Sequence, residues 1–529
     1  MKKIKYTILS VFIMAISLSS CNNNAWIEHY SPENTGKSDL NLYEYINSQS
    51  DLTIFAQMLK TTGYDSILSK PQAYTVWAPV NSALSAIDLT DTTAVTEIIK
   101  NHITRFSHPT SGISSKTIYM LGKKFLTFKK TDDGYTFGGK SLIPEKSNMA
   151  TSNGVLHCID GYVPYMSNLW EYIGKAPGLD SLRAYLYSQT TYEFDAEASV
   201  EIGTNEFGQA IYDSVITFKN PVLDEIGQLQ IEDSTFTAIL PNNTAWTKAY
   251  NQIKNGYKTL VKDGGVQQQR LNTQWALVKN LIFRKQVANP AAYDSLYSST
   301  GSKFMNPAYL FDNATKTELS NGLAYTTDSL RFKAAESWQQ SIKIEAENSD
   351  YGRSYVYANL LGRSGLGSIY SNVISGNKYL IVEPTTVSNS TQNAVTFPIP
   401  NTLSGKYNIY CVFVPGNAIS ATDTKPYKVS YYFSYLDKNG VQVTDAAIDD
   451  KNMVTLPNRV GNVFKTNGSE ITKMYVTQFD FPFCNLIKDK SEAANITIKL
   501  KVKSEAKITE TALYSRIFRV DYIILEPAQ

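Results

Sequence analysis

Hydrophobic and polar residues alternate along the C-terminal third of the chain, and this pattern predicts β-strands. In residues 427–435 every second residue is hydrophobic, while Lys428, Ser430 and Ser434 fall on the other parity. Residues 496–503 alternate more regularly, with an aliphatic residue at every second position and threonine or lysine between. A period of two with one hydrophobic face is typical of half-buried antiparallel strands. Residues 340–529 are therefore predicted to form an all-β sandwich, with turns at sites such as Asn439-Gly440.

The first two thirds of the chain contain an internal repeat, in which four short blocks recur in the same order. The paired blocks are residues 42–46 with 169–173, 74–83 with 236–245, 100–105 with 279–284, and 153–156 with 321–324. This order predicts two copies of one domain. The start of the first block and the proline inside the second are 37 residues apart in copy one (42 to 79) and 72 apart in copy two (169 to 241), a difference of 35. We place this insertion near residues 195–233.

The blocks of copy one resemble the motifs of the fasciclin-like domain family. The matching residues are Thr75–Ala83, the pair Asn101-His102, and Asn153–Asp160 followed by Pro164. Copy two departs from the pattern, because Leu281 stands where copy one has His102 and residues 321–328 contain no histidine.

The resemblance implies two tandem α+β wedges, at residues 39–166 and 167–335, in which helices flank a small β-sandwich. Domains of this family are used in cell adhesion and extracellular binding and are not known chiefly as enzymes. The predicted fold class is therefore α+β for the two tandem domains, followed by the β-sandwich.

Residues 1–20 are predicted to be a signal peptide. Three lysines among the first five residues precede an uncharged stretch, residues 6–18, that is too short to span a bilayer, and small residues lead to Cys21. We expect lipidation of Cys21 and a lipidated linker over residues 21–38; the alternative is an ordinary cleaved signal followed by a free thiol. Several acyl chains would hold the protein on a membrane. The expected location is the outer membrane at the cell surface, with the periplasmic face as the alternative because Glu28 is the first acidic residue after the cysteine.

Charge and cysteine content narrow the range of partners. The formal net charge of +2 gives no electrostatic reason to expect nucleic acid or anionic lipid as a ligand. Beyond Cys21 the chain has only Cys158, Cys411 and Cys484, without metal-type spacing. At most Cys411 and Cys484 could pair, and Cys158 is expected to be a buried thiol.

The sequence offers no constellation typical of catalysis. Its four histidines, His29, His102, His108 and His157, all precede the second repeat. Residues 362–366 superficially suggest a nucleophile elbow, but the second glycine is displaced. Phosphate-binding loops and zinc-type histidine or cysteine motifs are absent from the sequence. We predict that the protein is not an enzyme, and a hydrolase in the C-terminal domain is the weaker alternative.

The two ends of the C-terminal region, residues 344–347 and 519–523, are similar to the first and last strands of carbohydrate-binding jelly-roll modules. That resemblance implies one structural calcium held by Glu345, Glu347 and Asp521, since calcium prefers hard oxygen ligands. The alternative is a solvated strand edge. No other cofactor is expected.

Four tyrosines near the start of the same region, Tyr351, Tyr355, Tyr357 and Tyr370, are candidate sugar-binding residues. An aromatic face can stack on the apolar face of a sugar ring. The alternative is that they belong to the core or its rim.

These observations predict a non-catalytic, lipid-anchored envelope protein that binds a glycan or a protein partner. The resemblance also implies a role as an accessory protein of an outer-membrane nutrient transporter. A structural adhesin for cells or matrix is the main alternative.

Overall fold

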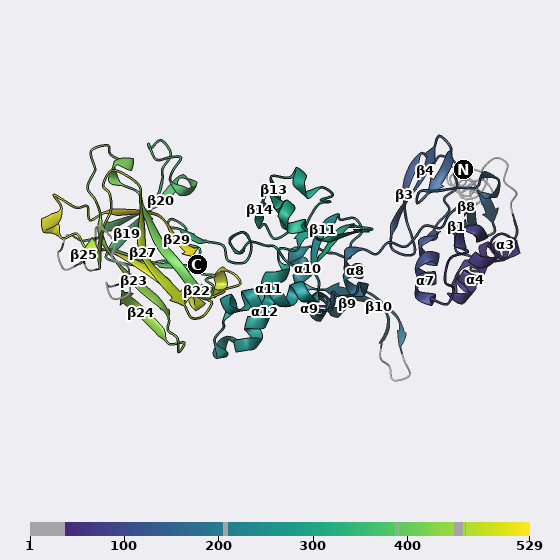
Figure 1. Ribbon diagram of the computed structural model, residues 1–529, viewed down its shortest axis with the longest axis horizontal. Coiled ribbons are helices and arrows are strands. Elements are labelled where there is room, and N and C mark those ends of the chain that lie inside the picture. The colour runs from purple at the N-terminus through teal and green to yellow at the C-terminus, as the bar shows by residue number, and fades with distance from the viewer. Residues whose placement is uncertain are drawn as a thin grey trace, which may run out of the picture. The chain divides into compact units, whose positions relative to one another are not determined.

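The computed structural model describes residues 38–204, 210–386, 388, 391–448, 459–460 and 462–528. The described chain forms two units (Figure 1). The first contains the chain up to Asn168 together with Gln230–Asp233 and Leu319–Asn321, and the second contains the rest. The predicted signal peptide, Cys21 and His29 lie outside the described residues. In the described ranges no helix is long and apolar enough to cross a membrane.

The first unit is built on a four-stranded sheet of order β2-β1-β8-β7. Its strands are β1 (Tyr74–Pro79), β2 (Ile103–Arg105), β7 (Met149–Thr151) and β8 (Gly154–Ile159). Strands β1 and β8 are parallel, and Tyr74 lies opposite Gly154. All six residues of β1 are buried, as expected for a strand packed on both faces. A glycine is needed at 154, because a Cβ there would lie 2.1 Å from the carbonyl oxygen of Tyr74.

Two layers cover this sheet. The helices are α3 (Leu42–Ser48), α4 (Thr53–Thr61), α5 (Tyr64–Leu68), α6 (Asn81–Leu84) and α7 (Thr92–Asn101). A second sheet contains β3 (Ser115–Tyr119), β4 (Phe125–Thr131), β5 (Gly134–Phe137) and β6 (Lys140–Ser141). Val76 and Ala78 of β1 belong to the core formed with the helices. Trp77 belongs to the core formed with the second sheet, where its ring stacks on Phe137 at 4.0 Å.

The second copy, in the second unit, repeats this arrangement. Its sheet has the order β12-β11-β16-β15, with β11 (Phe236–Pro241), β12 (Ile282–Phe283), β15 (Thr315–Leu319) and β16 (Gly322–Thr327). Strands β11 and β16 are parallel, and Phe236 lies opposite Gly322. A Cβ at 322 would lie 1.9 Å from the carbonyl oxygen of Phe236. The equal strand order, register and required glycine confirm the predicted repeat.

Copy two differs from copy one in its additions. Its helices are α8 (Leu169–Lys175), α9 (Asp180–Ser188), α10 (Pro221–Ile226), α11 (Asn243–Ile253) and α12 (Gly265–Val278), and a short hairpin pairs β13 (Ser295–Tyr297) with β14 (Lys303–Met305). Between α9 and α10 lies a hairpin of β9 (Thr191–Thr204) and β10 (Ala210–Lys219), which has no counterpart between α4 and α5. Phe194 pairs with Ile216 and Tyr192 with Phe218, so one face of this hairpin is hydrophobic.

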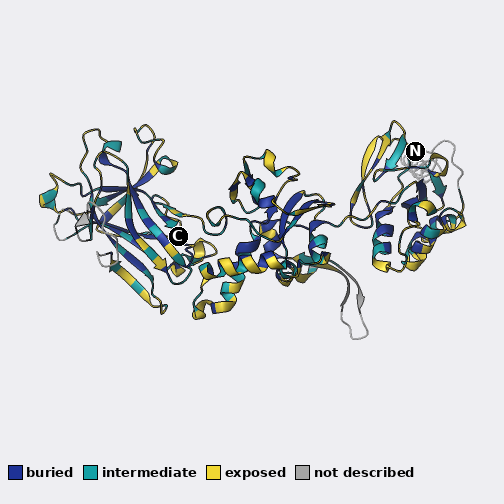
Figure 2. Ribbon diagram, in the orientation of Figure 1, coloured by how far each residue is buried: buried dark blue, intermediate teal, exposed yellow. Residues whose placement is uncertain are grey.

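The C-terminal region is a sandwich of two antiparallel sheets, as the alternating pattern predicted. The six-stranded sheet contains β17 (Ile342–Glu345), β19 (Ala358–Ser364), β20 (Lys378–Pro384), β22 (Gly405–Phe413), β27 (Thr472–Phe481) and β29 (Phe518–Pro527). The seven-stranded sheet contains β18 (Ser354–Val356), β21 (Ala394–Pro398), β23 (Lys428–Leu436), β24 (Gln442–Ala447), β25 (Arg459–Val460), β26 (Val463–Lys465) and β28 (Lys499–Ser504). Ile409 and Cys411 of one sheet, and Val429 and Tyr431 of the other, are fully buried. Figure 2 shows buried segments along the strands of this region.

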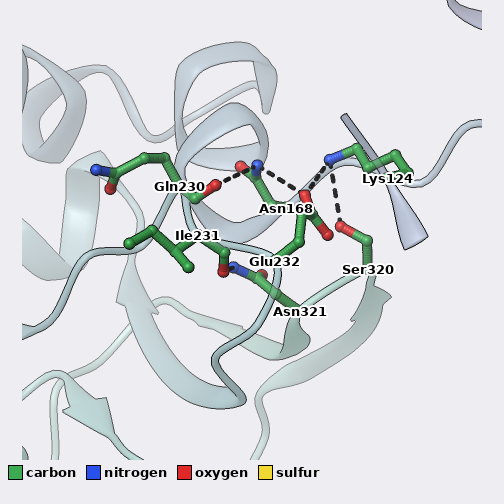
Figure 3. A network of polar contacts seen from close by, with 7 residues as sticks. All are labelled: Lys124, Asn168, Gln230, Ile231, Glu232, Ser320 and Asn321. Atoms are coloured by element: carbon green, nitrogen blue, oxygen red, sulfur yellow. Dashed lines mark hydrogen bonds and ion pairs between the residues drawn. The ribbon is translucent and has the colours of Figure 1, made fainter. Parts of the chain in front are cut away.

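A polar network fixes the two short segments that complete the first unit (Figure 3). The ammonium of Lys124 in the turn before β4 donates to the Glu232 carboxylate at 2.6 Å and to the Ser320 hydroxyl at 3.3 Å. The side-chain amide of Asn168 donates to the same Glu232 oxygen at 3.0 Å and to the Gln230 carbonyl at 3.2 Å. Polar groups that are removed from water in this way need partners, and here they have them.

Candidate ligand-binding surfaces

The four tyrosines singled out from the sequence occupy different environments. Tyr355, in β18, and Tyr357, directly after it, are 57% and 52% exposed. Tyr370 packs against the hydrophobic cluster around Ile374, and its hydroxyl donates to a backbone carbonyl. Tyr351 is half-buried. Within the described chain no ring contact joins these four tyrosines, and only Tyr355 and Tyr357 present most of their rings to solvent.

The outer face of the six-stranded sheet carries three other tyrosines that the sequence analysis did not single out. In β22, Ile409 and Cys411 point into the sandwich, so Tyr410 between them points outward and is half-buried. Tyr410 lies opposite Tyr475 of β27, and their rings meet edge to face at 5.4 Å. Tyr522 of β29 lies opposite Val412, two residues along the same face of β22. The three half-buried rings therefore share the outer face of this sheet, and the Lys343 ammonium lies 4.2 Å from the centre of the Tyr522 ring.

Charged and amide side chains accompany these rings. The Lys473 ammonium lies 4.3 Å from the centre of the Tyr410 ring and 2.7 Å from the Glu526 carboxylate. The side-chain amide of Gln478 donates to that of Asn408 at 3.1 Å on the same face. Rings flanked by amides and ion-paired groups can stack on a sugar and hydrogen-bond its hydroxyls. The alternation alone did not reveal this face, because a strand pattern does not tell which outward tyrosines remain uncovered.

A cleft of about 440 Å³ lies where α11 and the turn after it meet the sandwich. Its lining includes the half-buried Trp338 together with Gln252, Asn255, Gln339 and Asp480. A Cβ at Gly256 would lie 3.3 Å from the Trp338 ring, so the glycine lets the chain pass close to it. This combination of one aromatic ring and several amides offers a second candidate surface for a polar ligand.

The carboxylates proposed as calcium ligands lie near one another, and only some of their oxygens have hydrogen-bond or ion-pair partners. Asp521 is fully buried and accepts two hydrogen bonds from the backbone N–H of Ser375, at 3.1 and 3.2 Å. One oxygen of Glu345 accepts from the Ser375 hydroxyl at 2.7 Å and pairs with the Lys343 ammonium at 2.9 Å. The second oxygen of Glu345 and one oxygen of Glu347 are buried without a hydrogen-bond partner.

The electrostatics of this corner favour a proton on Asp521. Burial raises the pKa of Asp521 to about 7, the N–H of Ser375 opposes this, and the charges of Glu345 and Glu347 add to the increase. Lys343 already supplies a cation to Glu345, and the described residues contain no group of three or more side chains arranged to hold a metal ion. The unpartnered oxygens of Glu345 and Glu347 leave room for another ligand, so the calcium site stays a prediction.

The described histidines have structural surroundings. His102 is fully buried, with Nδ1 2.7 Å from the Ile98 carbonyl and Nε2 accepting from the N–H of Val163 at 2.9 Å. His157 is also fully buried, and its Nε2 lies 2.9 Å from the carbonyl of His108. Burial lowers the pKa of both His102 and His157 to about 4, so both rings are neutral at neutral pH.

Three cysteines lie in the described chain, and all are free thiols. Cys411 and Cys484 therefore do not pair. Cys411 is enclosed between the sheets, whereas Cys484 lies 3.6 Å from the Thr259 hydroxyl. Burial raises the pKa of the Cys158 thiol to about 12, and it also raises the pKa of the other two. Such thiols are poor nucleophiles, because the thiolate is the reactive form.

The family model described as Fasciclin domain matches residues 50–163, which lie in copy one. Copy one therefore contains a fasciclin domain. No curated protein sequence matches the chain.

Among solved structures, a FAS1 domain pair from the insect cell adhesion molecule Fasciclin I is similar at 15% identity, with 54% of this chain and 98% of that chain covered and a TM-score of 0.21. The C-terminal family 22 carbohydrate binding module of Clostridium thermocellum Xyn10B is similar at 15% identity, covering 33% of this chain and 86% of that chain, with a TM-score of 0.18. A xylan-binding domain of the same module family is similar at 16% identity, with 36% and 97% covered and a TM-score of 0.20.

Proposed function

We propose that this protein is a non-catalytic, lipid-anchored envelope protein that binds a glycan on the outer face of its six-stranded sheet. The observation that carries the proposal is the group of Tyr410, Tyr475 and Tyr522 on one outer sheet face, with amide and ion-paired groups beside the rings. All three rings are half-buried, and the ammonium groups of Lys473 and Lys343 lie over the rings of Tyr410 and Tyr522, where they can also donate to sugar hydroxyls. Binding through stacking and hydroxyl recognition requires no reacting group on the protein.

The test is a glycan array on the purified protein, followed by calorimetric titration with the strongest glycan. The double variant Tyr410→Ala, Tyr522→Ala should bind about tenfold more weakly or worse, because each ring loses a stacking contact of about 1 kcal/mol. Tyr432 is the matched control, because it is a half-buried tyrosine on the outer face of the other sheet with Lys501 5.6 Å from its ring centre. Tyr432→Ala should bind normally.

Two outcomes would contradict the proposal. The proposal is wrong if the intact protein binds no glycan. It is also wrong if Tyr432→Ala loses as much affinity as the double variant Tyr410→Ala, Tyr522→Ala. Trp338→Ala adds a third arm, which tests whether the cleft that contains Trp338 contributes to the same ligand. If Trp338→Ala abolishes binding while the tyrosine variants bind normally, the sheet face is not the site.

The membrane tether is the second part of the proposal. Cleavage before Cys21 and acylation of that residue would hold the protein at the outer membrane, with its domains at the cell surface. A Cys21→Ala form should leave the membrane fraction, and protease treatment of intact cells should remove the wild-type domains. Survival of the protein under that treatment would place it on the periplasmic side.

A protein partner is the second candidate, and the β9–β10 hairpin favours it. Tyr192, Phe194 and Ile216 on its hydrophobic face are 72%, 50% and 62% exposed. An exposed hydrophobic face of this kind is typical of contact surfaces between proteins. If the partner is an outer-membrane nutrient transporter, the two should co-purify from solubilised membranes, and Phe194→Ser with Ile216→Ser should prevent it. A structural adhesin, favoured by the fasciclin domain, would instead bind cells or matrix without a transporter.

A further inference from the structure

A groove of about 560 Å³ lies in the first unit, beside β2, β3 and the turn that follows β3. Its volume is within the range of sites for small molecules. Ile118 and Met120 in its wall are buried, whereas Phe106 and Tyr119 at its edge are 73% and 54% exposed. The groove thus lies over the core that contains Ile118 and Met120, and two exposed aromatic residues stand at its edge.

Three of the side chains that line the groove are cationic, namely Arg105, Lys116 and Lys123, and the lining contains no carboxylate or amide side chain. The Lys116 ammonium lies 3.2 Å from Nδ1 of His108. Burial, together with the charge of Lys116, lowers the pKa of His108, so the neutral ring can accept this hydrogen bond and hold Lys116 in place. No carboxylate of the described residues forms an ion pair with any of the three cations. The groove therefore has a positive potential without an internal counter-charge.

The backbone of Phe106 is held in a conformation that a bulky residue seldom adopts. Its φ is +67°, in the left-handed region. Its N–H donates to the Ala73 carbonyl at 2.9 Å, and its carbonyl accepts from the Thr75 hydroxyl at 2.8 Å. In copy two, Thr237 donates in the same way to the carbonyl of Lys285 at 2.7 Å, but Lys285 is not among the residues with positive φ. Copy one therefore keeps a strained aromatic residue where copy two has neither the ring nor the strain.

Lys123 shows the same difference between the copies. It occupies the turn after β3 with a φ of +60°, and its N–H donates to the Met120 carbonyl at 2.9 Å. The matching turn of copy two has Gly301 at φ +90°, and its N–H donates to the Ser298 carbonyl at 3.0 Å. Glycine suits this conformation and lysine does not. Two strained residues that both line one groove point to a function there, since strain of this kind persists mainly at functional sites.

We infer that this groove binds a small organic anion, in which a carboxylate, sulfate or phosphate group is attached to an apolar body. Arg105, Lys116 and Lys123 provide charge-assisted hydrogen bonds to the anionic group. Phe106 and Tyr119 cover the apolar body. The groove has no amide or carboxylate side chain to hydrogen-bond the hydroxyls of a neutral sugar. This site therefore differs from the tyrosine face of the sandwich.

The test uses the full chain and a fluorescent probe of this chemistry, 8-anilinonaphthalene-1-sulfonate, with the uncharged N-phenyl-1-naphthylamine as its counterpart. The wild-type protein should bind the sulfonate at least about tenfold more tightly than the neutral compound. Lys123→Gly should lose about tenfold in affinity for the sulfonate without a lower melting temperature, because it introduces the residue that copy two uses in the same turn.

A matched pair of variants separates the groove from binding elsewhere. Arg105 and Arg284 end the same repeated block and are both exposed. Arg105→Gln should weaken binding of the sulfonate about tenfold, whereas Arg284→Gln should leave it unchanged. The inference is wrong if the neutral compound binds as tightly as the sulfonate. It is also wrong if Arg105→Gln and Lys123→Gly bind like the wild-type protein.

Discussion

Lys124 and Glu232 form an ion pair that is almost completely removed from water. Their charged atoms are 2.6 Å apart, and the two side chains are only 4% and 9% exposed. The residues are 108 positions apart in the sequence, so the pair fixes a distant segment in the first unit (Figure 3). An ion pair in such surroundings stabilises only while both partners are present, because each charge alone would be buried without compensation.

Replacement of Lys124 by methionine should therefore destabilise the first unit by about 3–5 kcal/mol, measured as a lower melting temperature in calorimetry. The double variant Lys124→Met, Glu232→Leu should recover much of that loss, since it leaves no unpaired charge. The control is the more exposed pair Lys146 and Asp51, also 2.6 Å apart, with side chains 45% and 32% exposed. Lys146→Met should lower the melting temperature far less, because water screens this exposed pair. Equal losses in the two single variants would contradict the prediction.

The glycine at the start of each late strand gives a second prediction. Gly154→Ala and Gly322→Ala should each destabilise their own unit by about 3 kcal/mol, because the new methyl group would overlap a backbone carbonyl that cannot move aside. Gly362→Ala, in the exposed strand β19, meets nothing within 4 Å and should be close to neutral. Hydrogen exchange of β1 and β11 would locate the effect. If only one of the two variants is destabilised, the copies do not depend on this contact equally.

The repeat could be predicted from sequence because it rests on short-range rules. The prolines that end the two central strands, Pro79 and Pro241, are local signals, and the structure has parallel strands with matching register there. The paired strands of the sandwich also follow from a period of two. Local signals therefore determined which elements form and in which order.

The candidate sites depend on side-chain exposure, backbone conformation and hydrogen-bond partners, which could not be predicted from the sequence. Tyr355 and Tyr410 both lie in strands, but Tyr355 is more than half exposed and Tyr410 is half-buried, a difference that their neighbours in sequence do not give. The strain at Phe106 is visible only when its backbone is compared with that of Lys285. Likewise, Glu345 and Asp521 are near each other as predicted, but the role of Lys343 and Ser375 in satisfying them could not be inferred.

The first unit should lose stability in mild acid because of its buried histidines. His102 and His157 have pKa values of about 4 in the folded chain, well below the ordinary value of 6.5. Between these values the unfolded chain binds more protons, so stability is complete above about pH 6.5 and falls as the pH drops through 4. Each histidine contributes up to about 3 kcal/mol.

The second unit contains none of the four histidines and is the internal control. Hydrogen exchange at pH 5 and pH 7.5 should show acid-induced opening in β1 and β8, and a smaller change in β11 and β16. Equal opening in both pairs of strands would show that the histidines are not responsible.

Asp521 should give the sandwich a pH dependence of the opposite sign. Its pKa is raised to about 7 in the folded chain from an ordinary value of 3.8, so the folded state binds more protons between these values. The stabilising contribution is complete below about pH 4 and is lost as the pH rises through 7. The melting temperature of the sandwich should therefore fall between pH 4 and pH 7.5 in the wild-type protein. Asp521→Asn, which resembles the protonated side chain, should remove this fall and be the more stable form at pH 7.5.

Asp489→Asn is the control for this measurement, because Asp489 caps an exposed turn through Ser491 and its replacement should leave the slope unchanged. The same experiment bears on calcium. Since Lys343 already pairs with Glu345, we expect a chelator to leave the melting temperature of the sandwich unchanged at pH 7.5. A bound calcium ion would require Asp521 to be ionised, so a melting temperature that falls with chelator, and only in the wild-type protein, would restore the metal site and exclude the protonated carboxyl.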